Sequence, residues 1–148
     1  MMRIIPAMNE PPASRAAIDQ FLAPPRLLHL GVTEPDGTPL VHPVWYTWVD
    51  DTWLVHLGTT SRKRRAIDRQ PIVYGTIESP DGTVGVRGKA TARLDPDQDR
   101  LRRVLQAQCT HYARPPDSET YRLLFGLLET GDLVLAVLTP HYLAAWGL

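Results

Sequence analysis

The sequence predicts a mainly β (α+β) fold in which six antiparallel strands form a barrel flanked by helices. Its 148 residues, 43% apolar and 22% charged, are enough for one globular domain with a hydrophobic core. Residues 83–94 alternate between small or apolar side chains and polar ones, which is the period of a half-buried strand. Residues 34–37 and 80–82 are turn signals that end in Asp-Gly, and both residue types tolerate a positive φ. Closure into a barrel removes exposed strand edges.

The first half of the chain predicts a tail, one helix and three strands. Residues 1–12 are expected to form an N-terminal tail, and residues 13–148 a single domain. Ser14 can cap a helix that buries Ile18, Phe21 and Leu22 and ends at Pro24-Pro25. The strands that follow should form an antiparallel meander with tight turns, and they cover residues 27–33, 39–49 and 52–58.

The second half predicts three helices and three strands. A helix over residues 59–69 opens with hydroxyl residues that suit an N-cap. Two strands follow over residues 72–79 and 83–94. Two amphipathic helices, separated by Pro115-Pro116, are expected at residues 96–112 and 117–129. The last strand covers residues 133–138, and residues 142–146 either extend it or pair with it.

The bulk composition excludes several classes of function. Sixteen basic residues balance sixteen acidic ones, so no general attraction to nucleic acid or anionic lipid is expected. No apolar run predicts a membrane span or a signal peptide, which favours a cytoplasmic protein. The single cysteine, Cys109, allows no intrachain disulfide and no multi-cysteine metal site. The five histidines lack metal-ligand spacing, so no metal is expected.

The segment Thr59-Thr60-Ser61-Arg62-Lys63-Arg64-Arg65 lies between a predicted strand and a predicted helix. The N-terminus of a helix offers free backbone N–H groups and the positive end of its dipole. Hydroxyl groups and cations at the same place favour a phosphate-binding site. The alternative interpretation is a solvated basic face of the helix.

Several segments, taken in order along residues 14–142, resemble the pyridoxamine 5′-phosphate oxidase-like split-barrel superfamily, which includes FMN-dependent and deazaflavin (F420)-dependent members. The resemblance implies a six-stranded antiparallel split β-barrel of Greek-key type. The segments are Leu28-His29-Leu30-Gly31-Val32-Thr33, Asp36-Gly37-Thr38-Pro39 and Val41-His42-Pro43-Val44-Trp45-Tyr46 as the opening hairpin, Ser61-Arg62-Lys63 with Ile67 and Gln70-Pro71 as the phosphate-binding turn and helix, and Val86-Arg87-Gly88-Lys89-Ala90 as a "v-x-G-x-A" strand.

The resemblance also implies a function and a site. It implies a flavin-dependent oxidoreductase that binds FMN in a homodimer cleft and acts on a small organic substrate. No catalytic side chain is identified, because the flavin itself carries the chemistry of hydride transfer. The implied cofactor-binding residues line the flavin (Val44, Trp45, Tyr46), lie near its ribityl or phosphate end (His56), or hold its phosphate (Ser61, Arg62, Lys63).

Alternatives remain open on the same fold. Arg64, Arg65 and Arg69 suit the acidic tail of F420, so an F420-dependent reductase is the second candidate. A non-catalytic flavin- or heme-binding module is the third, and a dimeric scaffold without a site is the fourth. No Arg-Leu-x-Pro-like motif lies near the C-terminus, so pyridoxamine phosphate oxidase activity itself is not expected. Trp146 is a candidate for contact with the flavin ring.

Overall fold

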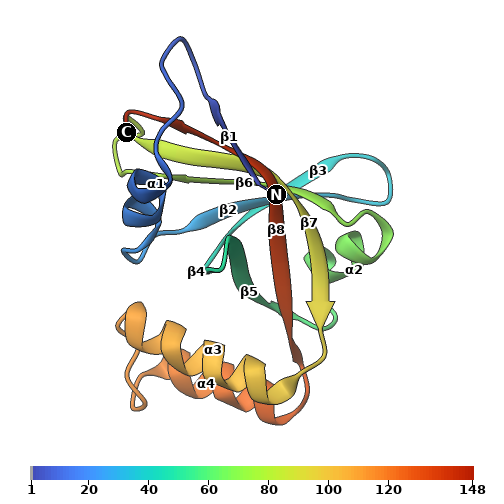
Figure 1. Ribbon diagram of the computed structural model, residues 1–148. Helices are drawn as coiled ribbons and strands as arrows, with labels where there is room; N and C mark the ends of the chain where they lie inside the picture. The colour runs from blue at the N-terminus through green and yellow to red at the C-terminus, as the bar shows by residue number, and fades with distance from the viewer. Residues whose placement is uncertain (1) are drawn as a thin grey trace.

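The computed structural model describes residues 2–148, which form one eight-stranded sheet and four helices (Figure 1). Seven strands are hydrogen-bonded in the order β3-β2-β6-β7-β8-β5-β4, and β1 pairs with β8 outside this path. The strands are β1 (Arg3–Pro6), β2 (Leu28–Thr33), β3 (Pro39–Val44), β4 (Thr47–Val49), β5 (Thr52–Gly58), β6 (Ile72–Glu78), β7 (Gly85–Asp95) and β8 (Leu133–Trp146). The helices are α1 (Arg15–Leu22), α2 (Arg62–Arg69), α3 (Gln98–His111) and α4 (Glu119–Glu129).

The predicted split-barrel architecture with flanking helices is confirmed, but the structure has eight strands rather than six. One additional strand is β1, which lies within the expected N-terminal tail and pairs in parallel with β8. Local periodicity could not reveal it, because Arg3 pairs with Tyr142 at the opposite end of the chain. The second arises because the strand expected over residues 39–49 is divided into β3 and β4.

The division between β3 and β4 has a physical cause at Tyr46. Its backbone N–H donates to the hydroxyl of Tyr112 at the end of α3, at 3.2 Å, instead of to a neighbouring strand. The Tyr112 hydroxyl in turn donates to the carbonyl of Arg26 at 2.6 Å. The side chain of Tyr112 thus takes the place of a sheet partner at this point, and the chain turns from β3 into β4.

The last strand is continuous from Leu133 to Trp146, so residues 142–146 extend it. A register irregularity opposite Lys89 and Ala90 leaves His141 out of the ladder, next to Pro140. Proline has no N–H to donate, and a bulge is where a strand tolerates it.

The strands β5 and β8 separate two hydrophobic clusters. Trp53, Val55 and Leu57 of β5 face the interior of the barrel, whereas Leu54 packs in a second cluster with residues of α3 and α4. Figure 1 shows α3 and α4 side by side against this end of the sheet. Since both faces of β5 are covered, a polar residue on its helix-facing side needs a partner there. His56 is such a residue.

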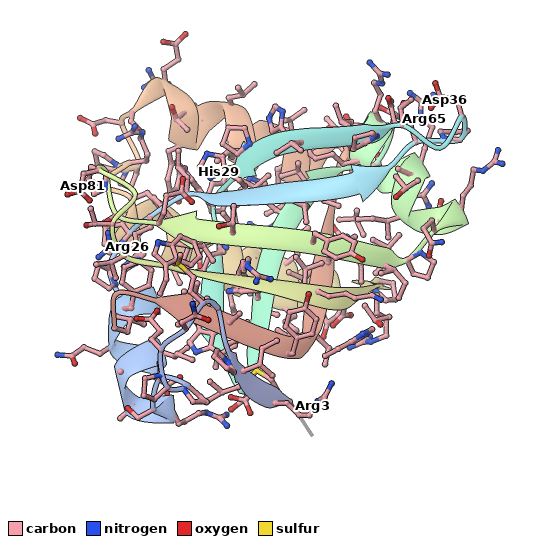
Figure 2. All side chains as sticks on the ribbon, turned by 90° about the horizontal axis from the view of Figure 1, so that it is seen from above. Arg3, Arg26, His29, Asp36, Arg65 and Asp81 are labelled. Atoms are coloured by element: carbon pink, nitrogen blue, oxygen red, sulfur yellow. The ribbon has the colours of Figure 1, made fainter. Side chains whose placement is uncertain are left out.

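The β2–β3 hairpin lies beside α2. Figure 2 shows the hairpin turn that carries Asp36 and the helix α2 that carries Arg65 at the same corner of the sheet. Arg62 forms an ion pair with Glu34 of the same turn. This contact links the N-terminus of α2 to the β2–β3 turn. In the described part of the chain, no helix is both long and apolar enough to span a membrane.

Candidate functional site

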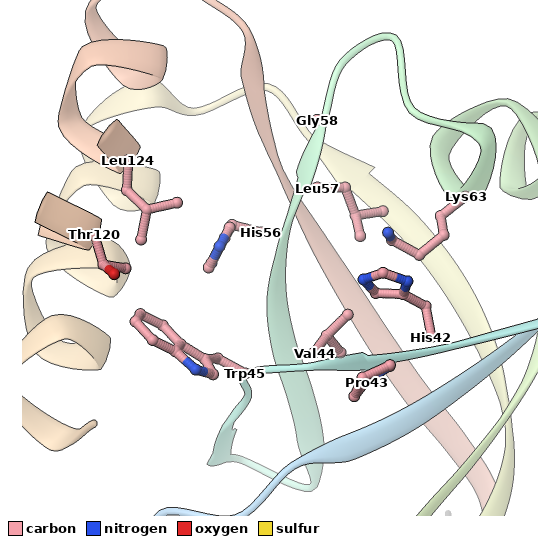
Figure 3. A pocket seen from close by; sticks show the side chains of 10 residues that line it. All are labelled: His42, Pro43, Val44, Trp45, His56, Leu57, Gly58, Lys63, Thr120 and Leu124. Carbon is pink, nitrogen blue, oxygen red and sulfur yellow. The ribbon is translucent and has the colours of Figure 1, made fainter. Parts of the chain in front are cut away.

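A cleft of about 320 Å³ opens between β3, the end of β5, the first turn of α2 and the first turns of α4 (Figure 3). Its volume lies at the lower end of the range for small-molecule sites. β3 is an edge strand, so one of its two lateral edges has no strand partner. The cleft is lined by His42, Pro43, Val44, Trp45, His56, Leu57, Gly58, Lys63, Thr120 and Leu124.

Trp45 forms one wall of the cleft, and its neighbours hold it in place. Its ring stacks on Tyr112 with centroids 4.7 Å apart and an interplanar angle of 3°. His56 meets it edge to face at 6.0 Å. Trp48 packs instead against the barrel core, so Trp45 and Trp48 contact different hydrophobic clusters. Trp45 therefore presents a rigid aromatic surface to a ligand.

The other end of the cleft carries a single positive charge. Lys63 is half-buried, and burial lowers the pKa of its ammonium group. It forms no salt bridge with any acidic side chain of residues 2–148. Desolvation and, second, the charge of Lys63 lower the pKa of His42, which is therefore neutral at pH 7. An uncompensated cation of this kind favours an anionic ligand group.

The structure brings four of the seven implied cofactor-binding residues together in the cleft: Val44, Trp45, His56 and Lys63. The other three have different surroundings. Ser61 is the N-cap of α2, where its hydroxyl accepts from the N–H of Arg64 at 3.2 Å. The guanidinium of Arg62 pairs with Glu34 outside the cleft. Tyr46 is buried in the barrel core, and its hydroxyl donates to the carbonyl of Leu22 at 2.9 Å.

Other residues singled out in the sequence lie outside the cleft. Trp146 packs over Gly85, where an added Cβ would lie 2.2 Å from its ring, and its indole N–H donates to the carbonyl of Gly82. Cys109 is buried in the helical layer, and burial raises the pKa of its thiol. Among residues 2–148 no three metal-ligating side chains gather in one place.

The sequence profile described as Pyridoxamine 5′-phosphate oxidase matches residues 14–134, which is most of the chain. The chain belongs to this family. The match confirms the resemblance drawn from the order of segments. No curated protein matches the chain.

Solved structures support the fold of this family member. An "F420 Reductase" is 22% identical with a TM-score of 0.67, and the match covers 85% of this chain and 94% of that one. A conserved hypothetical protein from Mycobacterium tuberculosis is 21% identical with a TM-score of 0.76, over 99% of this chain and 89% of that one. HutZ, described as a heme storage protein from Vibrio cholerae, is 18% identical with a TM-score of 0.70, over 90% and 94%. At these identities the likeness concerns the fold.

Part of the cleft could not be predicted from the sequence. His42 belongs to the opening hairpin, but no role was assigned to it. Thr120 and Leu124 come from α4 and reach the cleft only through the packing of the helical layer. Gln108 was also missed, although a glutamine on the apolar stripe of a helix, three residues after the buried Leu105, was a detectable signal.

His56 should make the stability of this family member depend on pH. Burial, and to a lesser degree the charge of Lys63, lower the pKa of His56 below its ordinary 6.5, although its hydrogen bond to Gln108 opposes the shift. The unfolded chain therefore takes up a proton at His56 first as the pH falls. The stabilisation by neutral His56 is complete above pH 6.5, and it is lost as the pH falls toward the lower pKa of the folded state. We therefore expect the melting temperature to decrease between about pH 7 and about pH 5.5.

Thermal melts of the parent and of His56→Asn check this expectation. The asparagine amide can still donate to Gln108 but does not titrate, so the variant should show a flatter pH profile. His111→Asn, at an exposed position on α3, is the matched control and should keep the parental slope. An equal slope in His56→Asn and the parent would contradict the expectation.

Proposed function

We propose that the chain is a flavin-dependent oxidoreductase that binds FMN in this cleft, at the interface of a homodimer, and acts on a small organic substrate. The observation that carries the proposal is Lys63, a half-buried cation without an acidic partner among residues 2–148, at one end of a cleft walled by Trp45. A planar ring system with an anionic group matches these two features. FMN combines both in one molecule.

The residues present fit FMN in chemical type. Lys63 would hold the phosphate, together with the free N–H groups in the first turn of α2. Trp45 offers a flat apolar surface for the ring, and Leu124 helps to exclude water from it. When bound, FMN supplies the capacity for hydride transfer. The protein's contribution is to bind, orient and shield.

The proposed partner is a second copy of the chain, seated on the outer face of the sheet. Gly31 of β2 pairs with Val41 of β3 on one side and with Tyr74 of β6 on the other, so the three residues form a row across the sheet. Val41 is 61% exposed and Tyr74 53% exposed, and Gly31 leaves a groove between them. Exposed apolar surface of this kind is typical of an interface. Because β3 also borders the cleft, a copy bound here would lie next to the ligand site.

Val41→Glu should therefore shift the protein from dimer to monomer. In a two-fold symmetric interface each substitution places two charges against apolar surface, so we expect the dimer dissociation constant to rise about a hundredfold. Light scattering during size-exclusion chromatography at several concentrations measures it. Leu123→Glu on α4 is the matched control, since Leu123 is also 61% exposed, and it should leave the dimer intact. If the parent protein is monomeric at all concentrations, the proposed dimer interface is wrong.

F420 is the second candidate cofactor. Arg65 and Arg69 of α2 are exposed and form no salt bridge with residues 2–148, so both remain available to an acidic tail beyond the cleft. The structural likeness to an F420 reductase points in the same direction. We also propose a cytoplasmic location, which agrees with a lone, buried cysteine without a disulfide.

Absorbance of the purified protein, followed by titration with FMN and with F420, tests the proposed function. A flavin spectrum or saturable FMN binding would support it, and turnover with a nicotinamide donor would establish an enzyme. Saturation by F420 alone would favour the second candidate. A Soret band would point to heme, and absence of binding to all three would refute the proposal.

A further inference from the structure

Gln108 of α3 is almost completely buried, with 1% of its surface exposed, and is the one buried side chain among residues 2–148 that is neither aliphatic, aromatic nor a thiol. Its amide nitrogen donates to the carbonyl of Leu54 at 3.2 Å and to the hydroxyl of Thr47 at 3.1 Å. Its amide oxygen lies 3.0 Å from Nδ1 of His56. The side chain thus ties α3 to β4 and β5 behind the cleft.

These contacts fix the orientation of the amide. The carbonyl of Leu54 can only accept a hydrogen bond, so the NH₂ group of Gln108 must face it. The oxygen of Gln108 must then face His56, and it can only accept. Nδ1 of His56 is therefore the protonated nitrogen.

The second ring nitrogen of His56 faces a different environment. Burial lowers the pKa of His56, so at neutral pH the ring carries one proton, and Gln108 holds that proton at Nδ1. Nε2 has no hydrogen-bond partner among residues 2–148 and is not sealed from solvent. His56 lines the cleft next to Trp45, as Figure 3 shows.

We propose that Gln108 is a positioning residue that holds His56 as the Nδ1–H tautomer, so that Nε2 is a fixed hydrogen-bond acceptor in the cleft and selects a ligand hydroxyl group. The cleft then has two chemically distinct ends. Lys63 takes an anion at one end, and His56 takes an uncharged donor at the other. This inference rests on the proposed function only for the identity of the ligand, because the tautomer is a property of the protein alone.

Nuclear magnetic resonance of the ligand-free protein tests the tautomer. Long-range ¹H–¹⁵N correlation spectra of histidine-labelled protein distinguish a protonated from an unprotonated ring nitrogen, and the His56→Asn variant assigns the signals. We expect protonated Nδ1 and unprotonated Nε2 at neutral pH. Protonated Nε2, or a doubly protonated ring, would overturn the proposal.

Gln108→Met tests the positioning role, because it keeps the bulk of the side chain and removes both hydrogen-bonding groups. We expect His56 to lose its preference for Nδ1–H in this variant. Gln106→Met, an exposed position on the same helix, is the matched control and should leave the His56 signals unchanged. A purely structural role of Gln108 would lower the melting temperature without changing the tautomer.

Two flavins test the selection of a donor. Riboflavin carries ribityl hydroxyls, lumiflavin lacks them, and neither has a phosphate. Gln108→Met should lower the affinity for riboflavin about tenfold, since one hydrogen bond to the ligand is lost, and should change the affinity for lumiflavin little. An equal loss for both would overturn the selective role. Failure of both flavins to bind the parent protein would instead refute the proposed function, and the tautomer measurement would still decide the role of Gln108.

Discussion

Replacing Lys63 with glutamine should weaken FMN binding about 10- to 100-fold and leave the affinity for riboflavin nearly unchanged. A hydrogen bond to a charged group contributes about 1.5–3 kcal/mol, and a half-buried cation without another partner is at the upper end of this range. Glutamine keeps a donor and most of the side-chain volume but removes the charge. Fluorescence titration with the two flavins measures the difference, because they differ only in the phosphate.

Two further variants locate the effect. Arg103→Gln removes a charge from an exposed position on α3 and should leave both affinities as in the parent. Arg62→Gln should also change FMN affinity little, because the guanidinium of Arg62 already pairs with Glu34. If Arg62→Gln instead lowers the FMN affinity as much as Lys63→Gln does, the phosphate lies at the turn between β5 and α2 rather than in the cleft. Equal losses of FMN and riboflavin in Lys63→Gln would show that Lys63 does not contact the phosphate.

The features that the sequence predicted are those with a local cause. The turns at Gly37 and Gly82 have φ of 86° and 74°, as the Asp-Gly signals require. The alternation in β7 is confirmed, with Val86, Ala90 and Ala92 buried. Ser14 caps α1 through a 3.1 Å bond to the N–H of Ala17. Each of these depends on neighbours within a few residues.

The features that the sequence did not predict depend on contacts between distant residues. Tyr46 and Tyr112 are 66 positions apart, and their hydrogen bond decides where β3 ends. His56 and Gln108 are 52 positions apart, and neither residue alone indicates the other. The basic run Arg62-Lys63-Arg64 reads as three equivalent cations, yet Arg62 forms an ion pair with Glu34, 28 positions away. The tertiary structure leaves Lys63 as the cation of the cleft.

The structure explains why the segment Val86-Arg87-Gly88-Lys89-Ala90 has a glycine at its centre. Gly88 lies in the middle of β7, where a glycine ordinarily weakens a strand. An added Cβ would lie 2.7 Å from the carbonyl oxygen of Tyr142, 2.8 Å from the side chain of Leu143 and 3.2 Å from the ring of Trp53. The space that a side chain would need is thus filled by β8 and by the largest side chain of the barrel core.

Gly88→Ala should therefore destabilise the fold by about 3 kcal/mol, the cost of forcing a methyl group into a packed interior. The oxygen of Tyr142 belongs to the backbone of the adjacent strand and cannot move without disturbing the β7–β8 ladder. Gly126→Ala is the matched control, and we expect it to change the stability in the opposite direction. Gly126 lies in α4 with no atom within 4 Å of an added Cβ, so alanine should stabilise the helix by about 0.5–1 kcal/mol. Urea unfolding of both variants measures the two changes, and a Gly88→Ala protein as stable as the parent would mean that β7 and β8 pack less closely than the structure shows.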